Sequence, residues 1–217
     1  MGSDLSVSEL KQEYLSIRED IKKRLGEFNK IWTDGSSEDI FYELMFCLMT
    51  PQSKAELCWA AVLKVKERDI LKVIKSEEIL DDMVGVRFKF KKSGYILEAR
   101  DKFFKNGSFI IKEIISAFPD VYKIRGWLAK DIKGIGLKEA GHFLRNIGYG
   151  EVLTILDRHI LKNLKKFSVI KEIPASLTPS KYFEIEKKMI EFSEKIGIPS
   201  DHLDLLFWYR EAGKIFK

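Results

Sequence analysis

The sequence predicts an all-α protein built as two helical lobes with a helix-hairpin-helix motif. Apolar residues recur at steps of three and four along almost the whole chain, which places them on one face of successive α-helices. Strand signals are few, and no internal repeat is visible. Past the middle of the chain, a Gly134-Ile135-Gly136 turn joins two stretches of matching helical period.

The N-terminal elements follow from periodicity and from start and stop signals. Residues 8–28 carry an apolar stripe that predicts an amphipathic helix, and the polar, glycine-containing segment 34–37 breaks it. Ser36 followed by Asp39 indicates the start of the next helix. That helix is expected to end at Thr50-Pro51, because proline disfavours helical conformation in the residue before it.

The middle of the chain predicts short helices separated by breaks. In order, these are a helix opened by Gln52, helices near 69–75 and 77–83, a basic and aromatic connector over 85–92, a helix over 93–105, a break at Gly107 and a helix over 109–117.

The C-terminal half continues the helical pattern. Its predicted elements are a helix begun by Pro119-Asp120, the Gly-Ile-Gly turn and its second helix, a break at 148–150, a helix from Asp157 to about Lys166, a long helix after Pro174 and Pro179, and a last helix capped by Pro199 and Asp201 and ended by Gly213. The breaks predict a central lobe over 36–148 that carries the hairpin. Residues 1–35 and 149–217 would together build the second lobe.

Composition narrows the class of protein. The 217 residues are 45% hydrophobic, which is enough for a sizeable core, and 38 Lys+Arg against 33 Asp+Glu give a net charge of +5. That excess permits a nucleic-acid partner, but solvated helix faces explain it equally well. No apolar run approaches the roughly 20 residues that span a bilayer, and the N-terminus is polar. We therefore expect a monomer without a membrane partner, located inside the cell in the cytoplasm or nucleoid.

Metal and cofactor chemistry is not expected. Cys47 and Cys58 lie in apolar helical patterns and are predicted to be buried. The histidines at 142, 159 and 202 are not spaced as metal ligands, and His142 is expected at the surface or facing a phosphate. A basic run at 162, 165 and 166 is interpreted as a solvated face, with a phosphate contact as the alternative.

The Gly-Ile-Gly turn can bind an anion. Gly134 and Gly136 let the backbone turn sharply and approach a phosphate without Cβ atoms in the way. The first N–H groups of the second helix lack intrahelical partners and can donate to an anionic oxygen. The alternative is an ordinary helical hairpin with a glycine cap.

Two further residues make the pattern more specific. Lys138 opens the second hairpin helix, where the macrodipole disfavours a positive charge and so suits a nucleophilic amine. Asp157 follows 19 residues later in LDRHI. Taken singly, Lys138 is a surface lysine and Asp157 a helix N-cap. Hairpin, lysine and aspartate together are far more specific than any one of them.

On these residues, segment 133–160 resembles the helix-hairpin-helix DNA glycosylase superfamily, which implies the HhH-GPD-like glycosylase fold. FYELMFCLMTPQSKAE is similar to the superfamily's early helix and LxxxQ turn. VRFKFKKSGYI and LDLLFWYREAGKIFK resemble the archaeal-type second class of 8-oxoguanine DNA glycosylase/AP lyases, which end in a lysine at the lesion pocket. The resemblance covers about 35–217.

The resemblance implies a bifunctional repair enzyme that acts on double-stranded DNA containing 8-oxoguanine. Lys138 would attack C1′ of the flipped nucleotide, expel the base, form a Schiff base and nick the strand by β-elimination. Asp157 would stabilise the oxocarbenium character of the sugar and align or deprotonate the amine. The alternatives are a glycosylase of the same fold for another damaged base, or a DNA-binding module without chemistry.

The resemblance also implies roles for other residues. Gln52 would fill the space that the flipped base vacates, Phe88 and Trp208 would line or sandwich the base, and the Lys217 carboxylate would accept hydrogen bonds from it. Trp208 could equally belong to the core, and Lys217 could equally be a disordered terminus. No cofactor is required, and a chain without cysteines after Cys58 excludes the iron–sulfur cluster of some relatives. A structural Na⁺ or K⁺ is expected at the hairpin, on the carbonyls of Lys130, Ile132 and Ile135.

Overall fold

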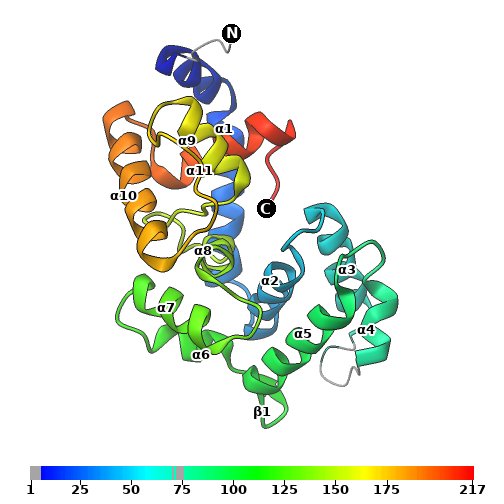
Figure 1. The fold of residues 1–217 in the computed structure, drawn as a ribbon. Coiled ribbons are helices and arrows are strands. Elements are labelled where there is room, and N and C mark those ends of the chain that lie inside the picture. The colour runs from blue at the N-terminus through cyan, green and yellow to red at the C-terminus, as the bar shows by residue number, and fades with distance from the viewer. Residues whose placement is uncertain (1–5, 70, 72–75) are drawn as a thin grey trace. The chain divides into compact units, whose positions relative to one another are not determined.

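The chain is helical and divides into two compact units (Figure 1). The computed structural model describes residues 6–69, 71 and 76–217. One unit combines Met1–Asn29 with Gly148–Lys217, and the other is Lys30–Ile147; we call these the terminal unit and the central unit. The boundaries predicted from the sequence were 36 and 148. The predicted all-α class is confirmed.

In the described residues, the elements are eleven helices and one short hairpin. They are α1 (Val7–Thr33), α2 (Ser37–Met49), α3 (Ala55–Glu67), α4 (Ser76–Asp82), α5 (Lys89–Phe103), β1 (Phe104–Lys105), β2 (Ser108–Phe109), α6 (Ile111–Ser116), α7 (Val121–Asp131), α8 (Leu137–Asn146), α9 (Arg158–Lys166), α10 (Pro179–Ile196) and α11 (Ser200–Ala212).

Helix α2 forms the core of the central unit. Every residue from Ile40 to Met49 is buried, as expected for a helix that is covered by neighbours on all sides. It packs against α3, α5, α6 and α8. The predicted start is confirmed as a capping box, in which Asp39 N donates to Ser36 Oγ at 3.1 Å and Ser36 N donates to Asp39 Oδ2 at 3.0 Å.

The central unit differs from the sequence predictions in several local features. Gln52 was expected to open a helix, but it lies in a turn with φ +56°, and α3 begins only at Ala55. The helix predicted over 93–105 already starts at Lys89. Segment 104–109 is a small antiparallel hairpin, which no strand signal indicated. The helix predicted near 69–75 falls mostly on residues 70 and 72–75, which lie outside the described residues.

The terminal unit is held by contacts between helices far apart in the sequence. Tyr14 Oη of α1 lies 3.0 Å from His202 Nδ1 of α11, and Glu13 forms a 2.8 Å ion pair with Arg210. The predicted caps of its helices are confirmed where Pro179 occupies the first turn of α10 and Gly213 ends α11 in left-handed conformation.

Burial also agrees with two sequence expectations. Cys47 and Cys58 are both buried and unoxidised. Among the described residues, none of the helices combines the length and apolar character that a membrane crossing needs.

Candidate active site

The hairpin turn depends on a glycine that packs against an aromatic ring. Gly134 has φ +90°, and a Cβ built on it would lie 2.3 Å from Cδ2 of Tyr95. Lys91 and Lys133 hold their ammonium groups 5.7 Å and 5.6 Å from the centre of the same ring. Ile132 and Ile135 turn inward and are buried, whereas Gly134 and Gly136 are exposed. The turn therefore presents bare backbone to solvent beside two positive charges.

Lys138 stands in the first turn of α8, as predicted, and is partly exposed. Its Nζ pairs with Glu139 Oε1 at 2.9 Å, and 27% of its side chain is accessible. The other oxygen of Glu139 accepts a hydrogen bond from Gly136 N at 3.3 Å. One carboxylate therefore caps the turn and holds the lysine beside it. Glu139 was not among the residues predicted from the sequence, although a glutamate three residues after a helix N-cap is the capping-box signal.

A monovalent cation at the hairpin stays a proposal. The Ile132 carbonyl already accepts a hydrogen bond from Ile135 N at 3.1 Å. A carbonyl oxygen has two lone pairs, so this contact is compatible with a cation on the same atom. The backbone carbonyls of Lys130, Ile132 and Ile135 therefore fit the expected donor set in their chemistry, and a cation held by them would supply charge compensation for a phosphate bound at the turn.

Gln52 and Phe88 are exposed residues on neighbouring turns of the central unit. Both have left-handed backbones, with φ +56° and +57°, which side chains other than glycine seldom adopt. Phe88 is 56% exposed, and the guanidinium of Arg87 lies 5.4 Å from its ring centre. Strained, exposed conformations of this kind cluster at binding sites.

Asp157 is the N-cap of α9. Its Oδ1 accepts hydrogen bonds from His159 N at 2.8 Å and Ile160 N at 2.9 Å. Within the described chain, no group donates to its second oxygen. Both interpretations of this residue can therefore hold at once, because the cap occupies one oxygen and orients the other.

The segment that leads into Asp157 is fixed by α10. Glu186 Oε1 accepts from both the N and the Oγ1 of Thr154, at 3.1 Å and 3.2 Å. Tyr182 Oη donates to the Thr154 carbonyl at 2.7 Å. All three residues are buried, so the approach to Asp157 is rigid although it is irregular in conformation.

Trp208 and Lys217 lie in the same unit as Asp157. The half-buried ring of Trp208 meets the His159 ring edge-on, with 5.0 Å between centroids. Its Nε1 is enclosed and has no hydrogen-bond partner among the described residues. Lys217 is 9% exposed, so the terminus is not frayed.

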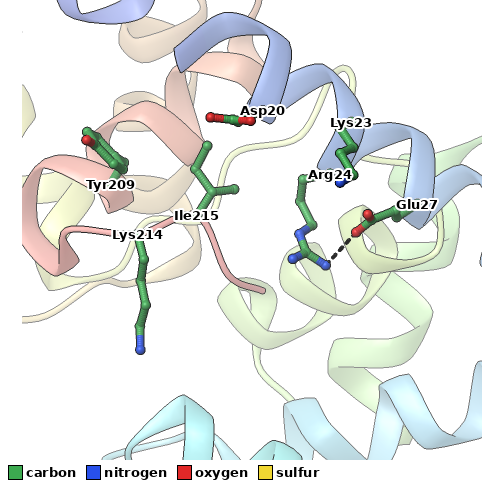
Figure 2. A pocket seen from close by; sticks show the side chains of 7 residues that line it. All are labelled: Asp20, Lys23, Arg24, Glu27, Tyr209, Lys214 and Ile215. Atoms are coloured by element: carbon green, nitrogen blue, oxygen red, sulfur yellow. Dashed lines mark ion pairs between the residues drawn. The ribbon is translucent and has the colours of Figure 1, made fainter. Parts of the chain in front are cut away.

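The C-terminal tail borders a pocket of about 350 Å³ between α1 and the end of α11. Figure 2 shows Ile215 directed toward Asp20 and Arg24 of α1, whereas Lys214 extends away from them. Arg24 forms a 2.7 Å ion pair with Glu27 in the wall of this pocket. Ile215 therefore anchors the tail just before Lys217.

One of two expectations about surface residues is wrong. His142 was expected at the surface or facing a phosphate, which is wrong, because it is 8% exposed and packs edge-on against Phe46. The basic run of α9 is exposed, as expected, and two of its lysines also form ion pairs. Lys162 and Lys166 both pair with Glu211 of α11, at 2.5 Å and 2.8 Å. No group of histidine, cysteine or carboxylate side chains suited to a metal occurs among the described residues.

The candidate residues fall into two local groups. The central unit holds the hairpin glycines, Lys138, Gln52 and Phe88. The terminal unit holds Asp157, Trp208 and Lys217. One group holds a partly exposed lysine near bare backbone, and the other holds an N-cap carboxylate, a half-buried tryptophan and the buried C-terminal residue.

Comparison with known proteins places this arrangement in a family. The model of the 8-oxoguanine DNA glycosylase family matches residues 21–198. An 8-oxoguanine DNA glycosylase/AP lyase of Fusobacterium nucleatum is 48% identical over 210 residues, which cover 97% of each chain. The crystal structure of the 8-oxoguanine DNA glycosylase of Thermotoga maritima has a TM-score of 0.86 and 31% identity, and covers 97% of this chain and 98% of its own.

A second solved structure contains DNA. The Methanocaldococcus jannaschii 8-oxoguanine glycosylase/lyase in complex with a 15mer DNA containing 8-oxoguanine has a TM-score of 0.85 and 35% identity, with 97% of this chain and 99% of that chain covered. The fold, the hairpin and the near-complete coverage of both chains all point to the same family. The chain belongs to the helix-hairpin-helix 8-oxoguanine DNA glycosylase family.

Proposed function

We propose that this protein removes 8-oxoguanine from duplex DNA and then cleaves the strand at the resulting abasic site. The observation that carries the proposal is Lys138, a partly exposed lysine on the first turn of α8, two residues after the bare backbone of Gly136. A phosphate bound to that backbone would bring the neighbouring sugar within reach of the amine. Family membership supports the same activity, since its relatives are named glycosylase/AP lyases.

The chemistry begins with Lys138 in its neutral form. Its Nζ attacks C1′ of the flipped nucleotide, the bond from C1′ to the base breaks, and the base leaves with the bonding electrons and takes up a proton. Loss of a proton from nitrogen and opening of the sugar ring then give a Schiff base. Removal of a C2′ proton and expulsion of the 3′ phosphate complete the β-elimination. Every step uses only the amine and proton transfer, without a redox reaction.

Asp157 supplies a carboxylate for the positive charge that develops on the sugar. Its Oδ1 is fixed by two backbone N–H groups of α9, so Oδ2 is the oxygen that would face the sugar. A carboxylate held in place in advance stabilises a developing cation without reorganising during the reaction. The same oxygen can accept the proton that Lys138 loses.

Recognition of the base is assigned to Phe88, Trp208 and Lys217. Two aromatic rings can sandwich a flat purine. The unpartnered Nε1 of Trp208 and the terminal carboxylate of Lys217 would supply a donor and an acceptor for polar groups at the pocket. Gln52, exposed on its left-handed turn, would occupy the gap left in the duplex.

Borohydride trapping tests this function. Wild type and Lys138→Gln are mixed with duplexes that contain 8-oxoguanine, thymine glycol or no lesion. We expect a covalent adduct of the wild type with the 8-oxoguanine duplex and no adduct of the variant. An adduct only with thymine glycol would assign a different base, and no adduct with any duplex would leave a DNA-binding module.

A further inference from the structure

Lys92 of α5 is a buried lysine to which the reaction above gives no role. It is 5% exposed, although a lysine is seldom buried unless its charge is compensated. Burial lowers the pKa of its ammonium, the nearby Cys58 opposes that effect, and the positive charges of Arg87 and Lys138 lower the pKa further. Burying a charged lysine costs free energy, so the contacts of its ammonium group should explain why it is buried.

The contacts of Lys92 show what its ammonium holds. Nζ donates to the carbonyl of Met49 at 2.6 Å, to the carbonyl of Pro51 at 2.7 Å and to Ser53 Oγ at 2.9 Å. A protonated lysine has three N–H donors, so all of them are used, and all three acceptors lie at the end of α2 or in the turn that follows. The buried, charged side chain of Lys92 therefore holds the turn that carries Gln52.

Ser53 extends the same network to the second turn. Its Oγ also accepts a hydrogen bond from Arg87 N at 3.0 Å, one residue before Phe88. The N–H of Lys92 donates to the Phe88 carbonyl at 3.0 Å, which begins α5 directly after the left-handed residue. Lys92 is thus bonded, through its own backbone and through Ser53, to both turns whose exposed residues have positive φ.

These contacts explain how two strained residues keep their conformations. A left-handed backbone at a residue other than glycine persists only where the surroundings over-determine it. At Gln52 and Phe88 the surroundings include the three hydrogen bonds of Lys92 and the bridge through Ser53, besides the 2.9 Å hydrogen bond from Ser53 N to the Thr50 carbonyl that closes the first turn. Hydrogen bonds to a buried charge are stronger than those between neutral groups, which suits this task.

We propose that Lys92 is a positioning residue for base extrusion. It locks the Gln52 turn and the Phe88 turn together, so that the residue that fills the gap and the residue that stacks on the base move as one piece. This inference rests on the proposed function, because it takes the roles of Gln52 and Phe88 from it. It makes a separate prediction about which of the two activities depends on Lys92.

The test compares excision with cleavage at a preformed abasic site. An abasic nucleotide has no base to extrude or to stack, so its cleavage needs Lys138 without the two turns. Lys92→Met keeps the length of the side chain and removes its donors. Lys64→Met is the matched control, since it removes the same charge from an exposed position on α3 of the same unit, away from the hairpin and the two turns.

We expect Lys92→Met to slow single-turnover excision of 8-oxoguanine by about tenfold to a hundredfold, whereas cleavage of the abasic duplex changes by less than about threefold. Lys64→Met should leave the ratio of the two rates at its wild-type value. If Lys92→Met does not fold, Ser53→Ala replaces it, because this variant keeps the ammonium and both carbonyl contacts but cuts the link to Arg87. It too should lower excision selectively.

Equal losses in both activities would overturn the proposal, because they would show that Lys92 only stabilises the fold. Excision rates equal to those of Lys64→Met would overturn it as well. If the wild type cleaves neither duplex, the proposed function itself fails, which is a result distinct from the other two.

Discussion

Replacing Gly134 with alanine should damage the hairpin by an amount that the structure allows us to work out. The new Cβ would lie 2.3 Å from Tyr95 Cδ2 and 2.9 Å from Cε2, whereas carbon atoms normally approach to about 3.5 Å. The ring must therefore retreat by about 1 Å, against the two lysines that flank it, at a cost of about 1–3 kcal/mol. A residue other than glycine at φ +90° adds about 1–2 kcal/mol.

The sum predicts that Gly134→Ala lowers the free energy of unfolding by about 2–5 kcal/mol, which corresponds to a fall of about 5–15 °C in Tm. The free energy of unfolding is measured by urea denaturation, with circular dichroism as the signal. Gly126→Ala is the control in the other hairpin helix, because a Cβ there meets no atom within 4 Å. That change should stabilise α7 by about 0.5–1 kcal/mol.

The same substitution in a second protein variant separates the steric contribution of the Tyr95 ring from the contribution of the backbone conformation. In a Tyr95→Ala protein the steric conflict is absent, so Gly134→Ala should cost only the backbone contribution of about 1–2 kcal/mol. A Gly134→Ala protein that is as stable as Gly126→Ala would contradict this prediction. The same loss of stability with and without the Tyr95 ring would contradict the steric part of it.

Three further predictions concern the terminal unit and the base pocket. Burial opposes ionisation of Glu211, but hydrogen bonds and charges from Lys162 and Lys166 outweigh it and lower its pKa from 4.5 to about 2. Its contribution to stability is therefore present above pH 4.5 and lost as the pH falls toward 2, so urea titrations should show a weaker acid dependence for Glu211→Gln than for wild type. Phe88→Gly removes the strain of a left-handed backbone, so the free energy of unfolding should change by less than about 1 kcal/mol. The rate of single-turnover excision should nevertheless fall at least about tenfold, because the stacking ring is lost. A parallel loss of stability would contradict this prediction. Deleting Lys217 should reduce 8-oxoguanine excision by at least about tenfold and leave binding to undamaged duplex within about twofold in fluorescence anisotropy, and equal losses would count against its pocket role.

Elements set by local chemistry were predicted well from the sequence. Helices begin or end where expected at five such residues, because caps and proline act over only a few residues. These residues are Ser36 with Asp39, Asp120, Pro179 and Gly213. Lys138 in the first turn of α8 is a local consequence of Gly136, and the N-cap role of Asp157 follows from its own sequence neighbourhood in the same way.

Features that depend on distant residues were not predictable. Gln52 was read as a helix start, but its turn is held by Lys92, forty residues later in the chain. The start of α5 was placed four residues late because a lysine-rich segment suggests a solvated connector, whereas Lys92 within it is buried. His142 was read as exposed since nothing in its own helix indicates that Phe46 of α2 covers it.

Charge pairing followed the same rule. The lysines of α9 are exposed as predicted, but their own segment could not show that Lys162 and Lys166 pair with Glu211, because Glu211 belongs to α11. Glu139 was the exception, since its spacing from Gly136 was visible in the sequence. The capping box could therefore have been predicted, and with it the position of the carboxylate beside Lys138.

The central claim is that Lys138 is the nucleophile, and peptide mass spectrometry of the borohydride-trapped protein tests it most directly. After digestion, the mass of the reduced deoxyribose adduct should appear on the peptide that contains Lys138 and on no other. An adduct on Lys133, exposed on the same hairpin, or on Lys92 would contradict the account, as would an adduct that persists at full yield in Lys138→Gln.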